Sequence, residues 1–170
     1  MSADRQSRSP RARSGVTIVV ADPAWRRALP RPVGWVREVA QATLAAAGRM
    51  QDRLTVALAD DQAVRVLNAR YRGQDKPTNV LSFPSTDLAE GLGDIILARQ
   101  TVLAEASRQG KPNAHHLAHL VAHGVLHLLG HDHARAGAAA RMERLERRVL
   151  AGFAIPDPYR LPARTGWRAA

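Results

Sequence analysis

The chain has 170 residues, of which 45% are hydrophobic, and this is enough for one compact domain of ordinary size with a buried core. It contains no cysteine, which excludes disulfide bonds and thiolate zinc fingers and is compatible with a reducing compartment. The formal net charge of +10 favours a polyanionic partner such as RNA or DNA, although an arginine-rich composition with basic ends produces the same total. No stretch is long and apolar enough to cross a bilayer.

Two basic ends flank the predicted domain. Residues 1–14 are rich in serine, arginine and proline, lack an apolar run, and are predicted to form a disordered basic arm. Residues 15–155 are predicted to form a single domain, and residues 156–170 a loosely held tail rich in proline and arginine. Because the first segment lacks the apolar centre of a secretory signal, we expect the protein to be cytoplasmic, with no membrane partner.

Predicted strands and helices alternate along the domain. Alternating or β-branched apolar residues predict strands at 15–21, 54–59, 79–83 and 94–98. Apolar residues at helical spacing predict helices over 33–47, 60–71, 101–109, 115–129 and 134–150. Residues 22–32 are predicted to form a loop interrupted by prolines. This order predicts an α/β (or α+β) fold with one sheet of about four strands packed with helices.

The last predicted helix, 134–150, carries charges of both signs at i,i+3 and i,i+4 spacing, which predicts a charged surface face. The residues of this face are Arg141, Glu143, Arg144, Glu146 and Arg147.

All seven histidines lie between residues 115 and 133. His123 and His127 are four residues apart and therefore share one face of a helix. Gly130 follows where a helix would end, so that His133 can return over the same face. These offsets match the zinc signature H-E-x-x-H-x-x-G-x-x-H, and three imidazoles leave the fourth position of a tetrahedral ion open for water. We therefore predict a catalytic site in which one Zn²⁺ ion is bound by His123, His127 and His133.

Other ligand sets stay open at this level. His119 and His123 have the same spacing as the favoured pair, and His131 is an alternative third ligand. Nickel and copper also bind imidazole sets. His119 either lines the cleft or belongs to the core, and Asp132 is a candidate acceptor for an imidazole N–H.

One departure from the protease signature changes the predicted chemistry. Zinc proteases carry glutamate, the general base, directly after the first histidine. Here that residue is Gly124, and no other carboxylate lies between His123 and His127. The metal site is therefore predicted, while peptide hydrolysis loses support.

A second candidate segment covers residues 68–84 and has the pattern of a helix end, a basic turn and a strand. One interpretation is a solvated charged loop. The functional interpretation is that Arg72 projects from a loop at the sheet's edge toward the metal, where its planar guanidinium binds a phosphate through two hydrogen bonds.

Together these segments resemble the YbeY family of bacterial metallo-endoribonucleases. Residues 123–133 match the family motif H-G-x-L-H-L-x-G-y-D-H, except that His131 stands where tyrosine is usual. Residues 71–84 and 93–96 resemble two further signatures of the family, and the likeness extends over about residues 15–155. The resemblance implies a mixed sheet with helices and the cleavage of single-stranded RNA.

By position, the resemblance also implies zinc ligands at His123, His127 and His133, and a catalytic arginine at Arg72. It further implies maturation of the 3′ end of 16S rRNA and ribosome quality control, with rRNA and the ribosome as partners. The predicted reaction is phosphodiester hydrolysis, in which zinc lowers the pKa of its water toward about 7 and Arg72 stabilises charge on the phosphate. The alternatives are a zinc metalloprotease-like hydrolase and a non-catalytic, zinc-stabilised ribosome-binding factor.

Overall fold

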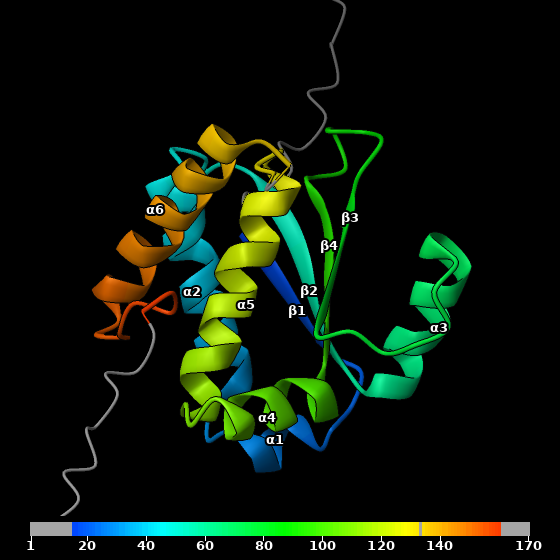
Figure 1. The fold of residues 1–170 in the computed structure, drawn as a ribbon. Coiled ribbons are helices and arrows are strands. Elements are labelled where there is room, and N and C mark those ends of the chain that lie inside the picture. The colour runs from blue at the N-terminus through cyan, green and yellow to red at the C-terminus, as the bar shows by residue number, and fades with distance from the viewer. Residues whose placement is uncertain (1–14, 133, 161–170) are drawn as a thin grey trace, which may run out of the picture.

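A four-stranded sheet lies at the centre of the domain (Figure 1), in a computed structural model that describes residues 15–132 and 134–160. Its strands are β1 (Gly15–Val20), β2 (Arg53–Ala59), β3 (Val80–Pro84) and β4 (Gly93–Ala98). The order across the sheet is β1-β2-β4-β3, in which β2 is parallel to both of its neighbours and β3 is antiparallel to β4. The single mixed sheet with helices that the sequence predicts is confirmed.

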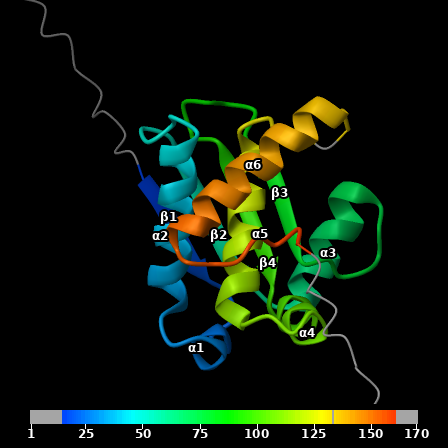
Figure 2. The same cartoon turned by 60° about the vertical axis from the view of Figure 1, so that its left-hand side comes forward.

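The described part of the chain forms six helices: α1 (Trp25–Ala28), α2 (Pro32–Ala46), α3 (Asp61–Arg72), α4 (Arg99–Arg108), α5 (Asn113–Leu128) and α6 (Ala136–Gly152). Helices α2 and α5 cover one face of the sheet, α6 packs against both of them, and α3 lies on the opposite face beside β3 and β4 (Figures 1 and 2). Within the described residues, none of the helices is long and apolar enough to cross a bilayer.

The alternation of side chains along the strands divides the core into two parts. Val56 and Ile95 are paired in register and point toward α2 and α5, where they are fully buried. Leu81 points the other way and packs with Val64 of α3 in a smaller cluster. Full burial of one such side chain contributes about 1.5–3 kcal/mol, so both helix layers are held to the sheet mainly by apolar contacts.

Helix α5 ends where the sequence predicts. Gly130 has φ +86°, its N–H donates to the His127 carbonyl at 3.0 Å, and the His131 N–H donates to the Leu126 carbonyl at 3.0 Å. This Schellman pattern uses the left-handed conformation that glycine adopts without strain, and it turns the chain back after the helix.

Helix α1 lies in the stretch that the sequence predicts to be a loop, so that prediction is wrong. Trp25 is fully buried there, and its indole N–H donates to the Ala59 carbonyl at 2.9 Å. Asp22 begins the turn by accepting from the Ala24 N–H at 2.9 Å and from Arg99 Nε at 2.5 Å. A helix of four residues has too few apolar positions to show a periodicity.

The predicted end segments are only partly described. Residues 1–14 and 161–170 lie outside the described residues. Within residues 156–160, Asp157 accepts from Arg147 Nε at 3.1 Å and the Pro158 carbonyl accepts from Lys111 at 3.5 Å. These contacts hold the beginning of the predicted tail against α6 and the start of α5.

Asp22→Asn is expected to remove a pH-dependent part of the stability. The hydrogen bonds from Arg99 and Ala24 hold the pKa of Asp22 below its usual range. The stabilisation is therefore present above the unfolded-state pKa of about 3.9, and it is lost as the pH falls through the lower folded-state pKa. Urea unfolding should show the variant about 1–2 kcal/mol less stable at neutral pH, with the difference closing below about pH 4.

The matched control is Asp75→Asn, because Asp75 pairs with Arg65 on an exposed surface where ion pairs contribute little. This control should change the free energy of unfolding much less than Asp22→Asn. A loss for Asp22→Asn that stays the same from neutral to acid pH would contradict the assignment.

Candidate active site

Arg72, His123 and His127 line one pocket, with a volume of about 310 Å³. The pocket is completed by residues of β3 and of the loop before it: Asn79, Val80, Ser82 and Pro84. The two candidate segments, far apart in the sequence, therefore meet at the β3 side of the sheet. Arg72 is the last residue of α3 and does not lie in a loop, because Gly73 ends the helix with φ +66°.

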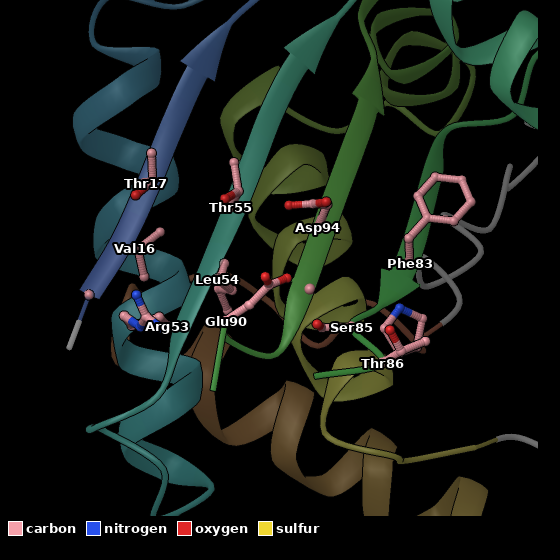
Figure 3. A pocket seen from close by; sticks show the side chains of 13 residues that line it. Val16, Thr17, Arg53, Leu54, Thr55, Phe83, Ser85, Thr86, Glu90 and Asp94 are labelled. Carbon is pink, nitrogen blue, oxygen red and sulfur yellow. The ribbon is translucent and has the colours of Figure 1, made fainter. Parts of the chain in front are cut away.

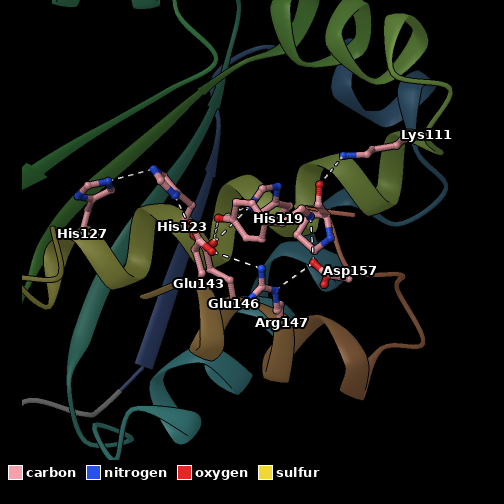
Figure 4. A network of polar contacts seen from close by, with 10 residues as sticks. Lys111, His119, His123, His127, Glu143, Glu146, Arg147 and Asp157 are labelled. Atoms are coloured by element: carbon pink, nitrogen blue, oxygen red, sulfur yellow. Dashed lines mark hydrogen bonds and ion pairs between the residues drawn. The ribbon is translucent and has the colours of Figure 1, made fainter. Parts of the chain in front are cut away.

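The two histidines of the pocket lie close together on successive turns of α5 (Figure 4). The Nε2 atoms of His123 and His127 are 3.0 Å apart. On the other side of its ring, His123 contacts Glu146 of α6, with 2.8 Å between Nδ1 and Oε1. The Nε2 edge of His123 thus faces its partner histidine, and its Nδ1 edge faces a carboxylate.

Glu146 is fully buried, so the predicted exposed position of this residue is wrong. Burial by itself would raise its pKa, but hydrogen bonds from His119, His123 and Tyr159 outweigh burial and lower the pKa of Glu146 to about 2. Helix α6 turns Glu146 inward because it lies four residues after the buried Met142 and belongs to the same face. The four-residue spacing from Met142 is the sequence feature that could have predicted the burial of Glu146.

The charge of Glu146 decides which nitrogen of His123 carries the proton. An ionised carboxylate can only accept hydrogen bonds, so Nδ1 of His123 is the donor. In the neutral imidazole the lone pair is then on Nε2, the atom beside His127. This is the arrangement in which histidine binds a metal through Nε2 while a carboxylate orients its other nitrogen.

Tyr159 closes the network from the segment after α6. Its hydroxyl donates to Glu146, and burial together with that carboxylate raises the pKa of Tyr159 above its ordinary value. Arg147 lies over the tyrosine ring at 5.1 Å and also binds Asp157, whose carboxylate accepts from the Tyr159 N–H at 2.9 Å. Neither Glu146 nor Tyr159 is predicted from the sequence to belong to a site.

The remaining predicted site residues are distributed as follows. The Nε2 atom of His119 lies 3.5 Å from the Glu146 carboxylate and 3.4 Å from the Tyr159 hydroxyl. His119 is not among the residues that line the pocket of Arg72. His131 lines a different hollow, on α6. Asp132 accepts from the backbone N–H of Ala134 at 3.0 Å, and the carboxylate that contacts Nδ1 of His123 is Glu146.

The third predicted ligand, His133, lies outside the described residues. Within residues 15–132 and 134–160, no group of three histidine or acidic side chains is arranged to hold a metal ion. The three-histidine set therefore stays a prediction.

Gly124 lies where helix α5 packs closely against the sheet. A Cβ atom here would lie 3.0 Å from Cγ2 of Ile95 and 3.3 Å from Oγ of Ser82. The Gly124 carbonyl also accepts from the Ser82 hydroxyl at 3.3 Å. A side chain at this position would therefore crowd Ile95 and Ser82.

A second hollow, of about 780 Å³, lies on the other face of the sheet (Figure 3). Thr17, Thr55, Asp94 and Phe83 form a row across the four strands there. It contains none of the predicted site residues, so the smaller pocket of Arg72 is the candidate active site.

Residues 29–154 match the family model described as Endoribonuclease YbeY. The chain belongs to this family. A relative from Azorhizobium caulinodans, named Endoribonuclease YbeY, is 47% identical to this chain over 87% of this chain and 98% of the relative. A relative of the same name from Alkalilimnicola ehrlichii is 50% identical over 81% of this chain and 87% of the relative. The solution structure of TM1509 from Thermotoga maritima, 22% identical, shares the fold with a TM-score of 0.54 over 88% of this chain and 99% of that one.

The match to the YbeY family confirms the resemblance predicted from the motifs. The matched span includes Arg72, His123, His127 and Glu146, and it ends before Tyr159. The pocket and the carboxylate behind it therefore lie inside the family's span.

Gly124→Glu is expected to lower the free energy of unfolding by about 3 kcal/mol or more, because a charged side chain would be forced between α5 and the sheet. The control is Gly137→Glu on α6, where a Cβ atom meets only the end of Arg141 at 3.8 Å. Urea unfolding of the control should stay within about 0.5 kcal/mol of wild type. Equal stability of both variants would show that α5 does not require glycine here.

Proposed function

We propose that the protein is an endoribonuclease that hydrolyses phosphodiester bonds of single-stranded RNA, using one zinc ion held by His123, His127 and His133. The observation that carries the proposal is the convergence of Arg72 with two histidines in one pocket, in a chain of the YbeY family. Its relatives are named endoribonucleases, which favours RNA over peptide as the substrate. We place its action in the cytoplasm, on the 3′ end of 16S rRNA and in ribosome quality control.

The residues present fit a zinc ion. Two nitrogens that are each about 2.0–2.1 Å from one ion lie no more than about 4 Å apart. The Nε2 atoms of His123 and His127 satisfy this limit at 3.0 Å. Glu146 supports the same role, because a carboxylate on Nδ1 keeps the lone pair of His123 at Nε2. When bound, zinc supplies a Lewis acid that lowers the pKa of water and polarises a phosphate oxygen.

Arg72 binds and orients the phosphate. Its guanidinium forms no ion pair with any residue in the described part of the chain, and it faces the same pocket as the histidines. Two parallel N–H donors match two phosphate oxygens, which holds the phosphorus in one orientation beside the histidines. The same donors stabilise the negative charge that grows on those oxygens in the transition state.

The packing of Gly124 argues against the protease-like alternative. The position of the protease base is glycine, and a Cβ atom there would already lie 3.0 Å from Ile95, so the proton of the attacking group must leave by another route. RNA is cleaved either by attack of water on the phosphorus, which is hydrolysis, or by attack of the 2′-hydroxyl, which is a transesterification. When water is the nucleophile, a metal that lowers its pKa would reduce the need for a separate base.

Glu146→Gln is expected to weaken zinc binding by about 10–100-fold while the fold is retained, because the neutral amide no longer favours the required tautomer of His123. The affinity is measured by competition with a chromogenic chelator. The control is Glu143→Gln, which removes a charge one turn earlier that contacts Arg147 and not the histidines. Equal zinc affinities for the two variants would refute the orienting role of Glu146.

The function is tested by combining metal analysis with cleavage of an unstructured RNA. Wild type should contain about one zinc per chain and cleave the RNA, and a chelator should stop cleavage. His127→Ala should lose zinc and activity together. Arg72→Ala should keep its zinc and lose about 10²–10³-fold in kcat/KM, with Arg72→Lys between the two.

Three outcomes would overturn parts of the proposal. Chelator-sensitive cleavage of casein without RNA cleavage would favour the peptide hydrolase. Zinc binding without any RNA cleavage would favour the ribosome-binding factor. Equal RNA cleavage by wild type and Arg72→Ala would place the activity elsewhere or in a contaminating nuclease.

A further inference from the structure

Three arginines form an exposed row along α6. Arg141, Arg144 and Arg148 follow each other at three and four residues, which places them within about 60° of one another around the helix axis. All three are exposed. We call these three residues the α6 arginine stripe.

The described residues leave the charge of the α6 arginine stripe without a counter-ion. None of its three guanidinium groups forms an ion pair with a residue of the described ranges, whereas Arg147 on the adjacent face binds both Glu143 and Asp157. Arg144 and Arg148 repel each other at i,i+4 spacing, which destabilises a helix by about 0.2–0.5 kcal/mol. No acidic residue shares this face of α6 with the three arginines. An anion bound to the stripe would relieve the repulsion.

The stripe borders a hollow of about 600 Å³ that is shared with the loop after α5. Its other lining residues are His131, Leu145 and Arg147. His131 lies four residues after His127, so the hollow adjoins the segment that follows the helix of the active site. Leu145 and the arginine stems provide apolar surface for a ribose or a base, on which planar guanidinium groups can also stack.

We infer that the α6 arginine stripe is a second RNA-binding surface, which holds backbone phosphates of the substrate strand outside the catalytic pocket. The inference rests on the proposed endoribonuclease function and adds a place for the strand beyond the bond that is cut. Seven residues of helix at 1.5 Å each separate Arg141 from Arg148, so the row spans about 10 Å and suits a run of successive phosphates rather than one ion. Single-stranded RNA is favoured over an acidic protein as the ligand of the stripe. The proposed substrate of the pocket is an RNA strand, and the phosphates next to the cleaved bond must lie on the protein surface near the pocket.

The test compares two triple variants that remove the same charge. The stripe variant is Arg141→Gln, Arg144→Gln and Arg148→Gln. The control variant is Arg26→Gln, Arg37→Gln and Arg108→Gln, three exposed arginines that also form no ion pair with a described residue. Binding of the full chain to a fluorescent 12-nucleotide single-stranded RNA is measured by anisotropy from low to moderate salt, with the integrity of the RNA checked on a gel.

The stripe variant should bind the RNA at least tenfold more weakly than wild type at about 0.1 M salt. The slope of log affinity against log salt should become less steep by about 0.7 for each lost phosphate contact, which is about 2 for the three arginines. The control variant should stay within about twofold of wild type. Cleavage of a trinucleotide, which needs only the pocket, should be the same in all three proteins.

Equal RNA binding by the stripe and control variants, whether unchanged or equally weakened, would overturn the inference. Weaker binding of an acidic protein with unchanged binding of RNA would also overturn it. Loss of trinucleotide cleavage in the stripe variant would show that the arginines act within the pocket and would contradict a separate surface. If wild type cleaves no RNA the proposed function fails, yet the binding comparison still decides whether the stripe holds RNA.

Discussion

The hydrogen bond between the buried carboxylate of Glu146 and Nδ1 of His123 is the contact on which the candidate site depends. It joins α6 to α5 inside the domain and places the proton of His123 on Nδ1. The lone pair of the neutral imidazole is then on Nε2, next to His127. A buried carboxylate is costly unless it is fully satisfied, and here His119 and Tyr159 share its remaining lone pairs. Helix α6 and the segment after it therefore belong to the site, although neither lines the pocket.

The rest of the pocket follows from the way helices lie on the mixed sheet. Gly124 lets α5 approach β3 and β4 closely, and Ser82 contacts its carbonyl directly. Helix α3 covers the other face beside β3, and its last residue, Arg72, lines the same pocket as the histidines. The antiparallel edge strand is thus the element over which groups from both faces of the sheet meet (Figure 1).

Sequence patterns predicted the elements that bury a regular apolar stripe. The four strands, the long helices and the left-handed turn at Gly130 follow from local periodicity and local backbone preference. Helix α1 was not predicted because Trp25 is held in place by a tertiary hydrogen bond to the Ala59 carbonyl. The four residues of the helix contain no pattern from which this distant contact could be predicted.

Within the site, the histidine spacing and the position of Arg72 could be read from motifs, because catalytic groups follow fixed offsets. Glu146 could not be separated from its charged neighbours by charge alone, since Glu143 and Arg147 follow the same i,i+4 pattern on the surface. What distinguishes Glu146 is its position on the buried face of α6, and the partners that make burial tolerable come from α5 and from Tyr159. Such a partner set is a tertiary property, which local spacing does not encode.

A crystal structure of the zinc-loaded protein would test most directly whether three imidazoles and the carboxylate behind them form the metal centre. The expected result is one zinc ion about 2.0–2.1 Å from imidazole nitrogens of His123, His127 and His133, with Glu146 still bound to Nδ1 of His123 and Arg72 facing the open position. Zinc held by His119 or His131 in place of His133, or zinc bound away from the pocket of Arg72, would contradict it.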